Sequence, residues 1–200
     1  AGYGTDKAIF GYGFSNAGGT YSLTNLVSNT GVVATDTTGV GSDRYNLAAT
    51  GYGSSGQAMF GYGSNFTVGY FSATNLVSNT GVVASDTTGV GTARQGLAAA
   101  GYGGDKAIFG YGYDNGGYSS LTNLVSNTGV VATDTAGVGT ARYSLAAAGY
   151  STDKAIFGYG SSAGGNQSVT NLVSNTGVVA NNTTGVGTAR WNLAAASYGS

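Results

Sequence analysis

The sequence predicts an all-β protein built from four copies of one repeat. The ten residues TNLVSNTGVV occur without a change at 24–33, 74–83, 122–131 and 170–179. Four arginines share this period, at Arg44, Arg94, Arg142 and Arg190. Glycine makes up 38 of the 200 residues, and no stretch keeps apolar residues at the spacing of a helix.

Each repeat contains four short segments with the character of β-strands. In the third copy these are residues 97–102, 106–111, 121–125 and 130–133. The first is rich in alanine, the second is bulkier and ends in Gly-Tyr-Gly, and the last two carry β-branched residues. Between the third and fourth lies Ser-Asn-Thr-Gly, where Asn127 and Gly129 tolerate positive φ and predict a hairpin turn.

A period near 50 residues with a recurring Gly/aromatic motif is typical of propeller blades. We therefore predict a single β-propeller domain over residues 1–200, with four four-stranded antiparallel blades at 1–46, 47–96, 97–144 and 145–192. The chain starts at a first-to-second strand turn and ends with a complete first strand, 193–198. Residues 193–200 are therefore expected to close the ring by pairing with the N-terminal blade. Two chains forming an eight-bladed ring are the alternative.

The order of Arg142, a small apolar strand and KAIFGYG at 154–160 resembles kelch-type repeats. Gly-Tyr-Gly stands where kelch repeats have adjacent glycines, and Val130-Val131 stands where they have a Trp. The strings TNLVSNTGVVATDTAGVGTAR at 122–142 and LAAAGYG at 97–103 are similar to Gly-rich tandem arrays in bacteriophage and marine viral structural proteins. That resemblance covers essentially the whole chain. It implies a virion- or tail-associated protein located in the virion or outside the cell.

The composition argues against catalysis and against several kinds of partner. The chain has no His, Cys or Glu, and its eight acidic residues are all Asp. Without a common general base, a paired carboxylate or a ligand cluster, we expect no enzyme activity, no cofactor and no metal site. A net charge of −1 gives no basic surface for nucleic acid, and no apolar run approaches a membrane span. Neither nucleic-acid binding nor membrane insertion is expected.

The copies differ mainly in two places. The stretch before TNLV reads FSNAGGTYS, SNFTVGYFS, YDNGGYSS and SSAGGNQS, and the two residues after each Arg also change. In a four-strand meander, the loops between strands two and three and between strands four and one emerge on the same face. The unchanged SNTG turn emerges on the opposite face.

The variable face is rich in aromatic, amide and hydroxyl side chains, as paratopes are. We predict a non-catalytic module that recognises a carbohydrate or cell-surface receptor, as a monomer or homodimer and as part of a larger virion assembly. The candidate ligand-binding residues are Phe14, Asn16, Tyr21, Tyr45, Asn65, Phe66, Tyr70, Gln95, Tyr113, Asp114, Tyr118, Tyr143, Asn166, Gln167 and Trp191.

Other interpretations of the repeats remain open. Exposed loops tolerate drift, so the variation can arise without a ligand. The chain can also be a purely architectural virion repeat, or a Gly/Tyr-rich self-assembling protein of low complexity. The four arginines are expected to be structural, because a guanidinium has five donors that would satisfy loop carbonyls at blade junctions.

Overall fold

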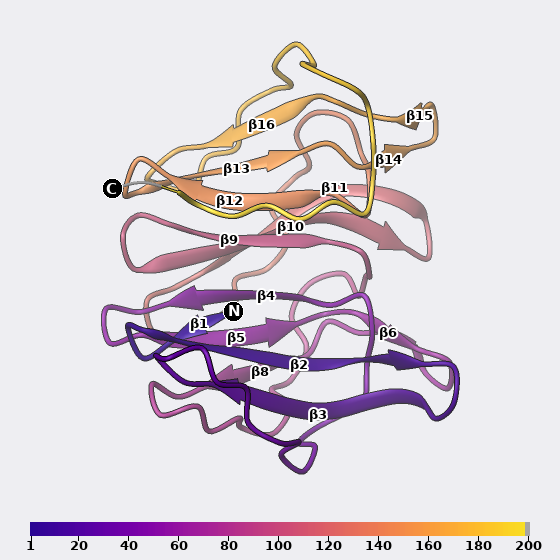
Figure 1. The fold of residues 1–200 in the computed structure, drawn as a ribbon. Helices are drawn as coiled ribbons and strands as arrows, with labels where there is room; N and C mark the ends of the chain where they lie inside the picture. Colours follow the sequence, from indigo (N-terminus) through magenta and orange to yellow (C-terminus); the bar gives the residue numbers. More distant parts are fainter. Residues whose placement is uncertain (199–200) are drawn as a thin grey trace.

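The computed structural model describes residues 1–198 and consists of β-strands and loops (Figure 1). The described part of the chain contains no helix long and apolar enough to cross a membrane. The strands are β1 (Gly2–Tyr3), β2 (Lys7–Ser15), β3 (Gly19–Val27), β4 (Ala48–Tyr52), β5 (Gln57–Gly61), β6 (Ser64–Asn65), β7 (Gly69–Tyr70), β8 (Thr74–Val77), β9 (Ala98–Tyr102), β10 (Lys106–Asp114), β11 (Gly117–Val125), β12 (Ala146–Tyr150), β13 (Lys154–Gly158), β14 (Ser161–Ser162), β15 (Gly165–Asn166) and β16 (Thr170–Val173).

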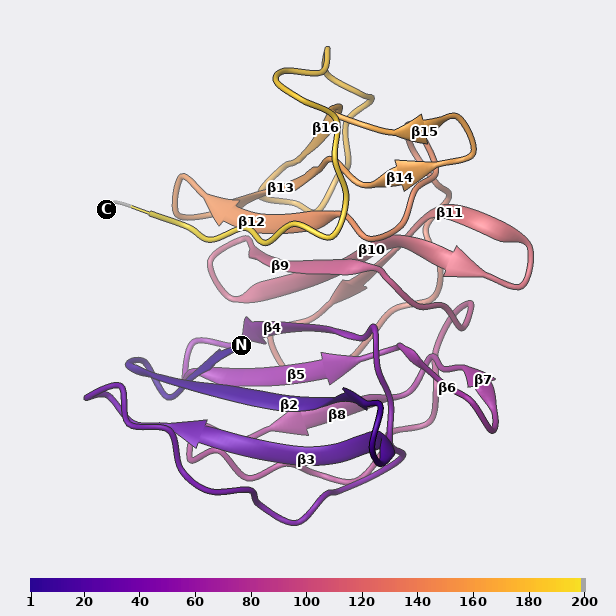
Figure 2. The same ribbon diagram turned by 45° about the vertical axis from the view of Figure 1, so that its right-hand side comes forward.

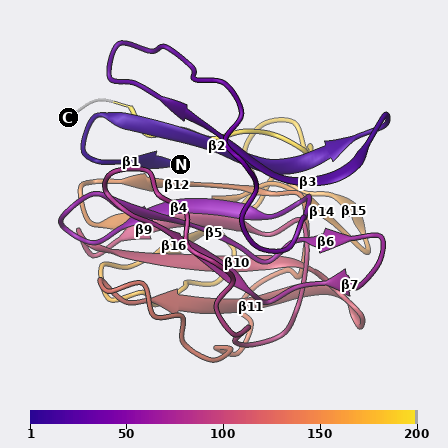
Figure 3. The ribbon, with the colours of Figure 1, turned by 90° about the horizontal axis from the view of Figure 1, so that it is seen from below.

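Each repeat forms one three-stranded antiparallel sheet, which confirms the all-β prediction and the first three strands of the repeat. The sheets are β1-β2-β3, β4-β5-β8, β9-β10-β11 and β12-β13-β16. In the second and fourth repeats the far end of the sheet separates into a short hairpin, β6–β7 or β14–β15. Seen from below, the strands of the different sheets all run in roughly the same direction (Figure 3).

The prediction of a regular fourth strand is wrong. Residues 130–133 are held to the third strand by an isolated bridge between Val125 and Val131, and a second bridge joins Thr122 to Thr135. Between these bridges, Asn123 Nδ2 donates to the carbonyl oxygen of Ala132 at 3.0 Å and to the Asp134 carboxylate at 2.9 Å. A side chain thus occupies the place where a continuous backbone ladder would run.

The SNTG segment forms the predicted turn. The Ser126 N–H donates to the carbonyl of Val130 at 2.9 Å, and the Gly129 N–H donates to the carbonyl of Ser126 at 3.1 Å. Gly129 adopts a φ of 82°, whereas Asn127 does not enter the positive region. A Cβ added at Gly129 would lie within 2.9 Å of the Tyr52 ring in the preceding repeat, so the turn is packed against its neighbour.

The hydrophobic core lies between successive sheets. Three clusters of buried residues each combine side chains of two adjoining repeats. At the centre of the second cluster, the Phe109 ring covers Gly61 of the preceding sheet, where an added Cβ would lie 2.7 Å from the ring. Phe60 covers Gly11 and Phe157 covers Gly110 in the same way. The glycine of each second strand therefore makes room for the phenylalanine of the next repeat.

Both ends of the chain depart from the predicted phasing. The first residues are not a turn, because Gly2 and Tyr3 pair with Ala8 and Lys7 as the end of a first strand. Within residues 1–198, the segment 193–198 forms no strand and lies along β12 (Figure 1). The Ser197 hydroxyl donates to the carbonyl of Gly149 in β12 at 2.7 Å. No closed ring is seen in the described residues, so ring closure stays a prediction, as do the repeat boundaries.

We expect Phe109→Ala to destabilise the fold by about 3–5 kcal/mol, because it empties a fully enclosed aromatic site between two sheets. Phe10 is the matched control, since it has the same repeat position but is 62% exposed. Phe10→Ala should change the free energy of unfolding by less than about 0.5 kcal/mol in dilute solution. Urea denaturation of both variants checks this, and equal losses would contradict the junction packing described here.

Candidate functional site

The two variable stretches of each repeat meet at one end of the molecule. Isolated bridges join the residue after each buried Arg to the hairpin of the following repeat: Tyr45 to Ser64, Gln95 to Tyr113, and Tyr143 to Ser161. The hairpins that contain these residues, such as β6–β7 and β14–β15, lie on the right-hand side of Figures 1 and 2. The third strands run away from this end, which carries the SNTG turns to the opposite side.

Aromatic side chains gather at this end in two clusters. The first contains Phe14, Tyr45 and Phe66, with ring centroids 5.2–5.9 Å apart. The second centres on Tyr113, Tyr118 and Tyr143, whose centroids are 5.4–5.8 Å apart. We call the two clusters together the aromatic face; its members are Phe14, Tyr45, Phe66, Tyr70, Tyr113, Tyr118, Tyr143 and Trp191.

Much of the aromatic face is open to solvent. Phe66 is 68% exposed, Phe14 is 48% exposed and Trp191 is 47% exposed. Single exposed apolar side chains are ordinary, but adjoining ones form a patch of the kind that marks interaction sites. Tyr45 and Phe66 are stacked at an interplanar angle of 24°, whereas the rings around Tyr113 meet edge to face. The face therefore offers both ring planes and ring edges.

Several polar candidates are used within the chain instead. Asn65 is buried, and its Oδ1 accepts from the N–H groups of Thr67 and Val68 at 3.1 and 2.7 Å. Asp114 accepts from the Gly116 N–H at 2.7 Å in another hairpin. Both residues shape hairpin turns.

The two glutamines also have partners in the fold. Gln95 Oε1 accepts from the Ser64 hydroxyl at 2.6 Å, and Gln167 Nε2 donates to Ser162 Oγ at 2.9 Å. Asn16 and Asn166 are exposed and Tyr21 is half-buried, and all three stand outside the two aromatic clusters. The structure thus brings together eight of the fifteen candidates.

Three of the four arginines lie completely buried at the junctions between repeats. Arg94 Nε donates to the carbonyl of Tyr111 at 2.8 Å, and Nη1 donates to the carbonyl of Thr92 at 2.9 Å. Its Nη2 donates to Asn123 Oδ1 in the following repeat, and the guanidinium lies 4.6 Å from the centroid of Tyr62. The sequence predicted the carbonyl partners but missed the asparagine, although its invariance within TNLV was the available signal.

Arg142 repeats this arrangement, and Arg190 does not. Arg142 donates to Tyr159 O, Thr140 O and Asn171 Oδ1 at 2.7–2.9 Å. Arg190 is exposed, and its guanidinium contacts the carbonyl of Thr188 at 3.0 Å and the Tyr159 ring at 4.2 Å from its centroid.

Two aspartates complete the junctions. Asp86 accepts from the N–H and the hydroxyl of Ser42 in the preceding repeat, at 2.9 and 2.7 Å, and lies 3.3 Å from Arg44 Nη1. Burial raises the pKa of Asp86, but the hydrogen bonds from Ser42 and Asn75 and the charge of Arg44 outweigh it and hold the pKa below its ordinary value. Asp134 has the same kind of partners, and its pKa is lowered in the same way. These carboxylates therefore stabilise the fold in their ionised form.

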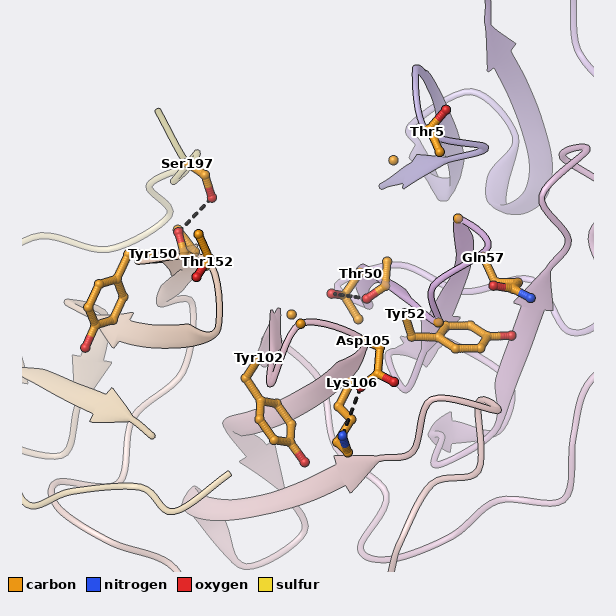
Figure 4. Close-up of a pocket in the computed structure, with 18 of the residues that line it drawn as sticks. Thr5, Thr50, Tyr52, Gln57, Tyr102, Asp105, Lys106, Tyr150, Thr152 and Ser197 are labelled. Carbon is orange, nitrogen blue, oxygen red and sulfur yellow. Dashed lines mark hydrogen bonds and ion pairs between the residues drawn. The ribbon is translucent and has the colours of Figure 1, made fainter. Parts of the chain in front are cut away.

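A cavity of about 920 Å³ lies among the first strands of all four repeats (Figure 4). First-to-second strand turns and residues 196–198 complete its lining. Its polar side chains include Thr5, Gln57 and the ion pair Asp105–Lys106, whose Oδ1–Nζ distance is 2.9 Å. We call it the central cavity. The cavity was not predicted from the sequence, although the turn after Gly-Tyr, which recurs in every copy, was the available signal.

In the part of the chain that the structure describes, no three His, Cys, Asp or Glu side chains stand close enough to share a metal ion. No known protein-family model matches the chain, and no similar protein was found among curated sequences.

We expect the protein to lose stability as the pH falls below about 4, because protonation removes the partners of buried guanidinium groups. A carboxyl whose pKa is depressed in the folded state contributes stability above its unfolded pKa, and this contribution disappears as the pH falls through the folded pKa. The double variant Asp86→Asn/Asp134→Asn should be less stable than the wild type near neutral pH. Between pH 7 and about pH 3 it should lose less of its free energy of unfolding than the wild type does. Asn182 holds the equivalent place in the last repeat, where its Nδ2 donates to Thr140 Oγ1 at 2.7 Å.

Urea midpoints measured across this pH range test the expectation. Asp6→Asn is a suitable control, since Asp6 is exposed and lies outside the junctions. An identical acid loss in the double variant and the wild type would show that other groups cause it.

Proposed function

We propose that this chain is a non-catalytic recognition module that binds carbohydrate through the aromatic face. The observation that carries the proposal is the position of the exposed rings. They come from the places where the copies differ, and they stand ring to ring across repeat boundaries, as Tyr45 does with Phe66, Tyr70 with Tyr113 and Tyr143 with Trp191. A surface that served only to connect repeats would gain nothing from large exposed aromatics.

The chemistry of the face suits sugars. Tyrosine and tryptophan provide large contact areas at a low cost in conformational entropy, because each has only two side-chain torsions. The ring planes of Trp191 and Phe66 can cover the apolar C–H faces of a pyranose, while the hydroxyls of Tyr118 and Tyr143 serve its hydroxyl groups. A shallow surface of this kind gives weak single-site affinity, which several linked sites can raise.

The unchanged SNTG turn supports the proposal less than the sequence alone indicated. Its glycine packs on a tyrosine ring of the preceding repeat, as Gly129 does on Tyr52, so its constancy has a structural cause. The contrast in variability between the two ends therefore does not by itself indicate a ligand. The aromatic content and the clustering of the exposed positions are what support a ligand.

We further propose that the four sheets are blades of a kelch-like β-propeller. In support, β4, β9 and β12 are successive neighbours around the central cavity, and a Cβ at Gly149 would lie 3.4 Å from the carbonyl oxygen of Gly101. Such close approach of first strands suits blades that converge on an axis. The resemblance to bacteriophage and marine viral repeats supports a virion or tail location, with a cell-surface glycan or receptor as the ligand.

A glycan array probed with the wild-type protein tests the proposal, followed by titration of any glycan that binds. Tyr118→Ala and Trp191→Ala should each weaken binding at least about tenfold, because each removes an exposed ring that contacts the sugar. Tyr198→Ala is the control, since Tyr198 is 98% exposed and borders the central cavity instead. It should bind as the wild type does.

Three results would count against the proposal. Failure to bind any glycan would favour a purely architectural repeat. Loss of binding in Tyr198→Ala alone would move the site to the central cavity. A non-cooperative thermal melt would favour the low-complexity, self-assembling alternative.

A further inference from the structure

We propose that the two ends of the chain are the two halves of a fourth repeat junction, through which a second copy of this chain docks head to tail. The three internal junctions show what such an interface contains. Each has a Phe ring over a glycine, a Tyr ring against an SNTG glycine, and an Arg bound to an Asn whose amide in turn donates to an Asp or Asn. The first sheet and the last sheet each present one half of this set.

The phenylalanine half lies at the start of the chain. Phe60, Phe109 and Phe157 are buried over the second-strand glycine of the preceding repeat, whereas Phe10 is 62% exposed. The missing partner lies in the last sheet. A Cβ at Gly158 would meet only Thr170 of its own repeat, at 3.2 Å, where the equivalent glycines meet a phenylalanine ring. Phe10 of one copy therefore fits over Gly158 of another.

The guanidinium half lies at the end of the chain. Arg190 already rests on Tyr159, as Arg142 rests on Tyr111, with 4.2 Å between the guanidinium carbon and the ring centroid in both cases. Among the described residues, no following repeat contacts it. In the first repeat, Asn25 Nδ2 donates to the Asp36 carboxylate at 2.8 Å, as Asn123 does to Asp134, but no arginine reaches this pair among the described residues. A positive group at one end thus matches an exposed carboxylate and amide oxygen at the other.

The tyrosine half gives a third, independent match. Tyr3, Tyr52 and Tyr102 are buried against the SNTG glycine of the next repeat, whereas Tyr150 is 39% exposed. The corresponding unpacked glycine is Gly31, around which an added Cβ would meet nothing within 4 Å.

The backbone edges also match. In the third repeat, Ala98 and Ala99 pair with Gly110 and Phe109, but the first-strand ladder of the first repeat stops before the equivalent Phe10 and Gly11. Residues 193–195 repeat the sequence of 97–99 and can fill this gap from a second copy. Residues 196–198 then turn aside, because β1 of the second copy already holds the remaining positions.

The two halves are exposed on the same molecule, which makes them available to another copy. An interface that joins different surfaces of identical chains is heterologous, and it extends to a ring or a filament according to the rotation at each step. The charge match and the continuity with three existing junctions select a second copy as the partner.

Charge reversal tests the proposal. Arg190→Asp places a carboxylate against Asp36 of the next copy, and Asp36→Arg places two guanidinium groups together. Each single variant should associate at least about 30-fold more weakly than the wild type, because a paired buried charge is replaced by a repulsive contact. Mixing the two variants restores an attractive contact at every mixed junction. The carboxylate introduced in the first variant meets the guanidinium introduced in the second, and the unaltered Arg190 of the second variant meets the unaltered Asp36 of the first. The mixture should therefore assemble again with the two variants in alternation, although neither variant assembles alone.

Sedimentation velocity over a wide range of protein concentration gives the masses. Phe10→Ala should also weaken association, with Val130→Ala as the control, since Val130 is similarly exposed, at 65%, but lies in an internal repeat. Thermal melts of dilute samples confirm that every variant is folded.

A wild-type protein that stays monomeric at all concentrations would overturn the proposal. A second pattern would also overturn it. In that pattern each single reversal lowers the melting temperature of a monomer, and stability returns only when both reversals are in one chain. That pattern would show that the two halves join within one molecule and close the ring. Neither result depends on whether the aromatic face binds a glycan.

Discussion

The buried guanidinium at each junction is the interaction on which the rest of the structure depends. Arg94 spans two repeats, because it bonds the carbonyl of its own loop and both a carbonyl and an asparagine of the next repeat. Burying a charge costs least when its donors are satisfied, and Arg94 has partners for Nε, Nη1 and Nη2, so the group fixes how adjacent sheets sit. At the first junction Arg44 is equally buried, but its Nε has no hydrogen-bond partner among the described residues. The residue that follows a junction arginine then has a defined partner, as Gln95 has in Tyr113. The aromatic face is therefore placed by contacts that lie beneath it.

Much of this fold could be predicted from the sequence because its signals are local. Glycine and β-branched residues marked the first three strands, and strand alternation was enough to gather Tyr45, Tyr113 and Tyr143 at one end. That the fourth strand is not regular could not be predicted, because it depends on the bonds that the Asn123 side chain donates to Ala132 and Asp134 and accepts from Arg94, which lies 29 residues away in the preceding repeat. Asn65 was assigned to a binding face for a similar reason. Nothing in its neighbours shows that its amide closes a turn.

The aromatic face and the end faces are geometrically related. Isolated bridges join Tyr45 to Ser64 and Tyr143 to Ser161. The residues at the corresponding repeat positions near the two ends of the chain are Trp191, which follows Arg190, and Phe14, which follows the first Gly-Tyr-Gly. If copies join as the internal repeats do, Trp191 of one copy stands beside Phe14 of the next. The aromatic clusters would then become continuous across the junction, and linked weak sites of this kind raise the overall affinity.

Each junction is made from the same set of residue types, with Asn182 in place of Asp as the one change on the acidic side. A repeat can therefore be inserted or removed as a whole, because the surfaces newly brought together already fit. Recombination between near-identical stretches of one gene would change the number of repeats without any compensating substitution. The number of repeats in such a protein is then free to vary, whereas the residues at its junctions are not. The unchanged sequence TNLVSNTGVV is what keeps every copy interchangeable.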